Sequence, residues 1–450
     1  MATQIIHKKS FIENPRSSCA LGGALITIGM MPDVIPIVHA SLGCAGNLSG
    51  AISMGGGSLG SGYCGGASIP TSGITETEIV FGGADRLREQ ISSTLELLDA
   101  KLFVVATGCM TEMIGDDVQG VVNEFDGEPV IAVSTPSFKG DSYTGYEIVL
   151  DGIFNRYLPK IPLKDEKLVN LFGLVPAYDP FFRGDLEELA RLIERLGLRA
   201  NTFFTPDQTF ENILSAPAAS LNIVFSHVWG VPFVERFESK HRTPYWTTDL
   251  PIGAEASDRF LIELGKLMGV SEALVQSVIE SENNYYYRYF ERAADMFSNA
   301  GYKFYAETVT NSNYAIPITS YIERELGWVA REAFVTDQAL PAQQRLLRDA
   351  FNASGLSSEL IFETDTTQIA KEITNRHPQS HGERFFAAEK PVFILGSALE
   401  RETAVKRGAF HLTISYPAAG RLILNRGYAG YKGGLNLFED ILGGERVPNV

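Results

Sequence analysis

The chain has 450 residues, of which 45% are hydrophobic and 20% are charged, a composition typical of a globular protein with several hydrophobic cores. Its net charge of −16 repels phosphate backbones and anionic lipids, so neither nucleic-acid binding nor membrane binding is expected. The longest mostly apolar stretch, residues 20–31, is too short to span a bilayer, and the N-terminus lacks the apolar region of a secretion signal. We therefore expect a cytoplasmic protein of about three domains.

Short apolar runs alternate with amphipathic helices along most of the chain. The predicted strands are residues 101–106, 129–133, 168–175, 199–204, 302–309, 359–363, 391–395 and 410–415, and the predicted helices are residues 85–98, 185–196, 285–299 and 341–352. This alternation predicts an α/β fold whose parallel sheets are covered by helices on both faces. Polar or proline-bearing segments at 159–167 and 281–284 separate three predicted domains, 1–165, 166–283 and 284–450.

One glycine-rich segment departs from this alternation. Between Gly43 and Gly66, 10 of 24 residues are glycine, which predicts a loop-like backbone. Gly55, Gly57 and Gly60 match the GxGxxG pattern, but a dinucleotide site also needs a buried strand just before it, and CAGNLSGAISM is not one. No Walker A motif occurs. We therefore expect no nucleotide on this chain. A dinucleotide-binding protein is the weakest of the hypotheses for its function.

The four cysteines, Cys19, Cys44, Cys64 and Cys109, all lie in the first quarter of the chain. Their spacings match no zinc motif, and buried unreactive thiols are the ordinary interpretation. However, Cys44 and Cys109 each follow an apolar strand, and ligands collect at the carboxyl ends of parallel strands. Cys19 lies in a proline-bearing loop before a helix start. Soft thiolates near backbone amide donors are what an iron–sulfur site requires.

The sequence blocks around these cysteines carry a family resemblance. NP-x3-C-x2-G, HxSxGC, TGCMTEMIGDD and TPSFKGDSYTG occur in this order, and RGYAGYKGGLNLFEDIL lies near the C-terminus. Together they resemble the β-subunit of the nitrogenase catalytic component. The resemblance implies three Rossmann-like domains and an α2β2 heterotetramer. It also implies an 8Fe–7S P-cluster, shared with an α-subunit and held on this side by Cys19, Cys44 and Cys109.

Two positions depart from the family pattern. The block that can supply a serine ligand to the oxidised cluster reads SFKGDSYTG here, so Asp141 and Ser142 are the candidate oxygen ligands. The alternative for Asp141 is turn capping, a common role of aspartate. The glycine-rich insert holds Cys64, which is expected not to be a ligand because the family pattern supplies three cysteines per subunit.

The histidines are expected to have no metal chemistry. His39, next to the Cys44 strand end, is expected to be structural rather than close to the cluster. The remaining histidines that show no metal-ligand spacing are His227, His241, His377, His381 and His411.

The absence of cysteine after Cys109 bears on function. In the family, a cysteine and a histidine of the α-subunit hold the catalytic cofactor, so no catalytic residue is expected here. The resemblance implies an oxidoreductase subunit that relays electrons from an ATP-dependent iron protein to its α-partner. In the positions that depart from the family pattern, the chain resembles the nitrogenase-like methylthio-alkane reductases, which cleave carbon–sulfur bonds. A dinitrogen-reducing nitrogenase is the alternative, and a cofactor-assembly scaffold is a third hypothesis.

Overall fold

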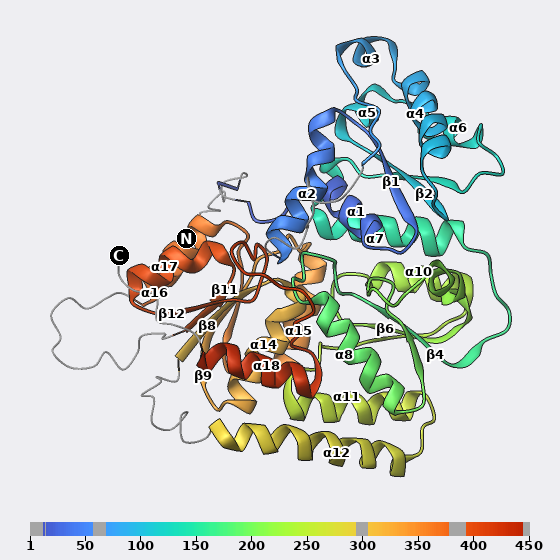
Figure 1. Ribbon diagram of the computed structural model, residues 1–450. Helices are drawn as coiled ribbons and strands as arrows, with labels where there is room; N and C mark the ends of the chain where they lie inside the picture. Colours follow the sequence, from blue (N-terminus) through green and yellow to red (C-terminus); the bar gives the residue numbers. More distant parts are fainter. Residues whose placement is uncertain (1–11, 14, 57–68, 294–304, 378–392, 444–450) are drawn as a thin grey trace, which may run out of the picture.

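The computed structural model describes residues 12–13, 15–56, 69–293, 305–377 and 393–443, and it contains three α/β units (Figure 1). Each unit is built on its own sheet, with strand orders β1-β2-β3, β5-β4-β6-β7 and β10-β9-β8-β11-β12. Every ladder between these strands is parallel. The α/β fold with parallel sheets predicted from the sequence is therefore confirmed.

The first unit carries the cysteines. Its strands are β1 (Val34–His39), β2 (Leu102–Thr107) and β3 (Val130–Ser134). Its helices are α1 (Ala20–Gly29), α2 (Leu42–Gly56), α3 (Glu76–Phe81), α4 (Ala84–Leu97), α5 (Cys109–Ile114), α6 (Val118–Asn123), η3 (Ser137–Lys139), α7 (Ser142–Leu150) and η4 (Asp151–Tyr157). Alternate side chains of β2 point to different cores: Phe103 and Val105 pack toward the outer face, and Val104 toward the core shared by all three units.

The second unit holds the strands β4 (Asp165–Phe172), β5 (Arg199–Asn201), β6 (Ala219–Val224) and β7 (Tyr245–Thr247). Its helices are α8 (Phe182–Arg195), α9 (Phe210–Ser215), η5 (Ala216–Ala218), α10 (Val231–His241), α11 (Gly253–Leu267), α12 (Glu272–Phe290) and η6 (Glu291–Ala293). The amphipathic stripe predicted for 185–196 is present in α8, which buries Leu189, Leu192 and Ile193.

The third unit holds the strands β8 (Tyr305–Thr310), β9 (Val329–Val335), β10 (Glu359–Phe362), β11 (Phe393–Gly396) and β12 (Phe410–Thr413). Its helices are α14 (Ser312–Ser320), η7 (Tyr321–Glu325), α15 (Pro341–Ala353), α16 (Thr366–Arg376), η8 (Ala398–Glu400), α17 (Arg401–Arg407) and α18 (Gly430–Leu442). The C-terminal α18 packs back on α8, α11 and α12 of the second unit. No helix in the described residues has the length and apolar character that crossing a membrane would take.

Two sequence expectations were wrong. The segment from Gly43 to Gly66 was expected to be loop-like because of its glycines, but its part up to Gly56 belongs to α2. Gly55 lies against Ala177, where an added Cβ would come within 2.6 Å, so close packing accounts for that glycine. The helix expected from residue 285 begins at Glu272, because Ser271 caps it and a buried stripe that includes Val275, Val278 and Tyr286 continues through it.

Candidate functional site

The carboxyl edge of the first sheet brings the predicted cysteine segments together. β1 and β2 are paired in register up to His39 and Thr107, so Cys44 and Cys109 follow neighbouring strand ends. The loop after β3 reaches the same edge: Ser137 in that loop bonds to Cys109, and Asp141 forms an antiparallel bridge with Cys19. All three cysteines are half-buried and free.

Cys109 begins α5 and has two protein contacts. Its sulfur lies 2.9 Å from the hydroxyl of Ser137 and accepts a hydrogen bond from the Ser137 backbone N–H at 3.1 Å. An amide donor at a sulfur stabilises negative charge there, which is the environment expected of an iron–sulfur ligand. Ser137 was not identified from the sequence. Its place just after a third buried strand was the available signal.

Cys44 lies in the first turn of α2, and its sulfur lies 3.5 Å from the Ser41 hydroxyl. Asn47, one turn further, donates to the Cys44 carbonyl at 2.9 Å. The carbonyl oxygen of the Asn47 side chain also lies 3.4 Å from the point that a Cβ on Gly22 would occupy. Gly22 is in the first turn of α1, so α2 carries Cys44 against the helix that Cys19 begins.

Cys19 is the N-cap residue of α1, as expected for a cysteine in the loop before a helix start. The N–H of Ala20 donates to the carbonyl of Gly140 at 3.1 Å, which fixes this helix start to the loop after β3. A cleft of about 380 Å³ opens beside Cys19, and its lining includes Arg16, Ser137 and Lys139. Ser137, which contacts Cys109, therefore lines the same cleft as Cys19.

Asp141 acts as the N-cap of α7. Its carboxylate accepts from the backbone N–H of Tyr143 at 3.1 Å and of Thr144 at 3.3 Å, and more weakly from that of Gln338 at 3.4 Å. Burial, and then the charge of Asp337, raise the pKa of Asp141 to about 6. The capping alternative is thus observed. Ser142 is fully buried and donates its hydroxyl proton to the Ser18 carbonyl at 3.2 Å.

His39 is a structural histidine in this fold. Its Nδ1 lies 3.0 Å from the Ser72 hydroxyl and its Nε2 lies 3.0 Å from the Asp116 carboxylate. Burial holds the pKa of His39 below its usual value, although Asp116 acts in the opposite direction. Asp116 also accepts from the N–H of Gly83 at 2.8 Å. This carboxylate therefore connects β1, the end of α5 and the turn after α3.

Some of the other residues named from the sequence fall outside the described part of the chain. Cys64, Gly57, Gly60 and His381 lie outside the described residues. Gly55, the first glycine of the GxGxxG match, lies inside α2, so a helix and not a strand precedes the pattern. The structure also brings His377 together with two glutamates, which sequence spacing did not reveal.

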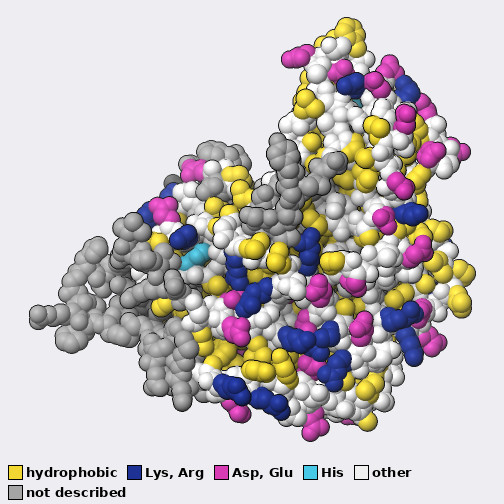
Figure 2. All heavy atoms as spheres, in the orientation of Figure 1, with side chains coloured by type: hydrophobic (Ala, Val, Ile, Leu, Met, Phe, Trp, Pro, Cys, Tyr) yellow, Lys and Arg dark blue, Asp and Glu magenta, His cyan; other side chains and the backbone are white. Residues whose placement is uncertain are grey.

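Exposed apolar side chains surround the cysteine edge. Leu42 lies two residues before Cys44, Phe138 follows Ser137, and Met113 is in α5, the helix that Cys109 begins; all three are well exposed. Phe81, at the end of α3, is 83% exposed. Figure 2 shows hydrophobic side chains at the tip of this unit, where α3 lies. Such a concentration of apolar surface is typical of a protein–protein interface.

Two known proteins are similar in sequence to more than half of this chain. The molybdenum-iron protein beta chain of Bradyrhizobium diazoefficiens is 24% identical over 296 residues, covering 58% of this chain and 54% of that protein. The iron-molybdenum cofactor biosynthesis protein NifE of Clostridium pasteurianum is 25% identical over 286 residues, covering 60% of this chain and 59% of that protein. The match thus spans little more than half of each of these relatives.

A solved structure shares the fold over nearly the whole chain. The structure titled "Nitrogenase Cp1 at pH 6.5" superposes with a TM-score of 0.76 at 20% identity, covering 98% of this chain and 94% of that one. The family model of the nitrogenase component 1 type oxidoreductases matches residues 19–444, a range that begins at Cys19 and includes all three units. This chain therefore belongs to the nitrogenase component 1 type oxidoreductase family.

Proposed function

We propose that the chain is the β-type subunit of a nitrogenase-like two-component reductase. Cys19, Cys44 and Cys109 would hold one side of a P-cluster-type 8Fe–7S cluster, and an α-type subunit would hold the other, in an α2β2 assembly. The cluster would supply one-electron transfer. The subunit would thereby relay electrons from an ATP-dependent iron protein to an iron–sulfur cofactor in the α-subunit.

The observation that carries this proposal is that three half-buried thiols lie on segments that meet at one sheet edge. A cluster enclosed by a single chain needs its ligands buried, whereas a shared cluster needs them at the surface that the partner covers. The donor set also fits the group, because the thiols are soft ligands and the Ser137 amide already donates to one sulfur. The exposed Leu42, Met113 and Phe138 supply an apolar surface for the partner beside these ligands.

The side-chain packing where the three units meet supports the proposal that the catalytic cofactor lies in the partner subunit. Tyr143 of the first unit stacks on Trp229 of the second, with ring centroids 5.1 Å apart. The indole N–H of Trp229 donates to Asp337 of the third unit, and Asn311 donates to the Tyr143 hydroxyl at 2.9 Å. These buried side chains fill the junction. The sequence has no cysteine after Cys109 that could hold a second cofactor there.

The test is iron and sulfide analysis of the complex, purified without oxygen. About eight irons per αβ interface, beyond those of the catalytic cofactor, are expected for the P-cluster type. A cofactor-assembly scaffold is the second candidate, and its specific support is the similarity to NifE. About four irons at the interface would favour that candidate, and none would exclude both.

We propose methylthio-alkanes as the substrate class, with reductive carbon–sulfur bond cleavage that consumes electrons and protons and releases a thiol and a hydrocarbon. Its support is the pair of departures from the family pattern, Asp141 in the serine-bearing block and the glycine-rich insert that holds Cys64. The alternative is dinitrogen reduction. Assays of the complex with its iron protein separate the two: thiol release from methylthio-alkanes is expected, and ammonia formation from dinitrogen without thiol release would overturn the proposed substrate.

A further inference from the structure

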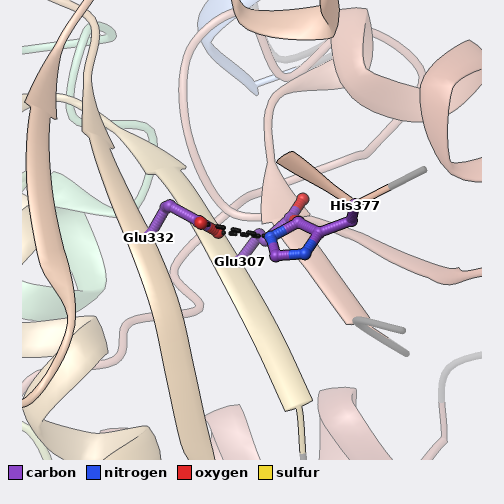
Figure 3. Close-up of side chains that lie close together, drawn as sticks. All are labelled: Glu307, Glu332 and His377. Atoms are coloured by element: carbon purple, nitrogen blue, oxygen red, sulfur yellow. Dashed lines mark hydrogen bonds and ion pairs between the residues drawn. The ribbon is translucent and has the colours of Figure 1, made fainter. Parts of the chain in front are cut away.

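Two glutamates and a histidine, residue types that can bind metals, lie close together in the third unit (Figure 3). Glu307 comes from β8, Glu332 from the neighbouring β9, and His377 directly follows α16. The Glu332 carboxylate oxygens lie 3.0 and 3.1 Å from Nε2 of His377, and Oε1 of Glu307 lies 3.6 Å from the same nitrogen. Each residue offers one ligand atom within 4.8 Å of the other two.

Glu307 lacks the partners that a buried carboxylate needs. Its side chain is fully buried, and neither of its oxygens has a hydrogen-bond partner among the described residues. An isolated buried carboxylate is costly unless it is protonated, paired or bound to a metal. Burial, and then the charge of Glu332, raise the pKa of Glu307 to about 8. Arg376 lies 3.9 Å from Glu332, and the charges of Arg407 and Arg331 lower the pKa of Glu307. Among the described residues, however, none of these cations donates a hydrogen bond to a Glu307 oxygen.

We propose that Glu307, Glu332 and His377 bind one divalent first-row transition-metal ion, such as Mn²⁺ or Zn²⁺. Two carboxylates and one imidazole form a mixed oxygen and nitrogen donor set, which suits these ions better than Mg²⁺ or Ca²⁺, which prefer oxygen ligands alone. The ion would join two strands and the end of a helix. The site lies in a different unit from the cysteines, so this proposal does not depend on the proposed function.

Arg331 competes with the metal for His377. Its guanidinium lies 2.5 Å from Nδ1 of His377 and can only donate there, so without the ion the imidazole proton is on Nε2, facing Glu332. A metal at Nε2 moves this proton to Nδ1, and Arg331 must then leave. Its guanidinium already lies 4.8 Å from the centroid of the Tyr305 ring, against which it can remain. Removing Arg331 should therefore strengthen metal binding.

Arg407 does not compete in the same way. Its guanidinium donates to the backbone carbonyl of His377 at 2.8 Å and not to the imidazole ring. Its charge lowers the pKa of Glu307 but does not cancel the effect of burial.

The experiment is a Mn²⁺ titration of the purified full chain, followed by the EPR signal of free Mn²⁺. The wild type should bind about one Mn²⁺ more per chain than the Glu307→Gln variant, or bind it at least about tenfold more tightly. Glu307→Gln keeps the size and shape of the side chain and removes only the carboxylate that would bind the metal, so the variant should fold. Arg331→Gln should bind Mn²⁺ several-fold more tightly than the wild type, and Zn²⁺ should displace the ion.

Glu359→Gln is the matched control, because Glu359 pairs with Glu332 across the strands but is largely exposed and bonds to Arg376. It should leave the affinity unchanged. Equal Mn²⁺ affinity in the wild type and Glu307→Gln would overturn the proposal. Weaker Mn²⁺ binding in Arg331→Gln would also overturn the proposal. Arg331 would then stabilise the three residues as part of an internal ion-pair network and would not compete with a metal for His377.

Discussion

Asp141 shows what one carboxylate does beside the candidate cluster site. Because it caps α7, Asp141→Ala should lower the free energy of unfolding by about 1 kcal/mol, measured by chemical denaturation. Asp141→Asn should lose less, since asparagine also caps helices. The midpoint potential of the interface cluster should stay unchanged in both variants. A rise in this potential would instead show that the carboxylate reaches the cluster and disfavours its reduced state.

The cysteines give the sharpest prediction at the residue scale. Cys44→Ala and Cys109→Ala should each disrupt the interface cluster, because a soft ligand is lost and its iron is left open. Metal analysis and EPR of the oxygen-free complex measure this loss. Cys64→Ser is the control and should keep both iron and activity. Full iron content with wild-type signals in the first two variants would show that they are not ligands.

What the sequence could reveal at this scale depended on local context. Cys44 and Cys109 were recognisable because each follows an apolar strand, and their place at one sheet edge then follows from parallel pairing. Glu307 and His377 are 70 positions apart, and only the fold brings them together. A glutamate inside the predicted strand 302–309 was the available signal, since a charge in a buried strand calls for a partner.

At the scale of elements, α1 and α7 cross at glycines. An added Cβ on Gly23 would overlap the backbone of Ser142, and one on Gly145 would overlap that of Ala20. Gly23→Ala should therefore separate the helices and lower the free energy of unfolding by about 1–3 kcal/mol. Gly50→Ala in α2 is the control: nothing lies within 4 Å of its Cβ position, so it should stabilise by about 0.5–1 kcal/mol. Denaturation of both variants measures the contrast, and equal effects would contradict it.

The helices and strands that could be predicted were those with a clear pattern of hydrophobic residues. The strands at 101–106 and 129–133 and the helix at 185–196 were found nearly in place, because buried parallel strands are continuous and α8 is strongly amphipathic. The helix α2 was missed because its glycines disfavour helix, whereas packing against Ala177 and neighbouring helices stabilises it. Strand β9 was missed because arginine and glutamate interrupt its apolar run.

At the scale of the whole molecule, buried carboxyls at the contacts between units give a pH dependence. Burial raises the pKa of Glu147 and Asp179 to about 7 and that of Asp185 to about 6. The folded chain keeps these protons to higher pH than the unfolded chain, so its stability should fall as pH rises from about 4 to about 7. The denaturant midpoint should be higher at pH 5.5 than at pH 8. A flat or rising midpoint would show that other groups dominate.

The exposed tip of the first unit should be a contact for the electron donor. Phe81 projects from α3, and the turn after it is bonded to Asp116, close to the end of α5, which Cys109 begins. Phe81→Ser should leave cluster iron and stability unchanged, because the side chain is exposed, but lower turnover with the iron protein about tenfold or more. Turnover at rising iron-protein concentration measures this, and Leu163→Ser, at another exposed apolar position, is the control.

The residues of the cysteine edge lie early in the sequence, and this has a consequence for biosynthesis. All three proposed ligands and their contacts Ser41, Ser137 and Asp141 lie before residue 142, so the ribosome releases this edge in the first third of translation. Long-range contacts come last, such as the Arg16 guanidinium with Glu400 and the Gln338 amide with Asp141. A nascent chain can therefore present its thiols to iron-delivering proteins before the third unit exists to fix the segment that precedes Cys19.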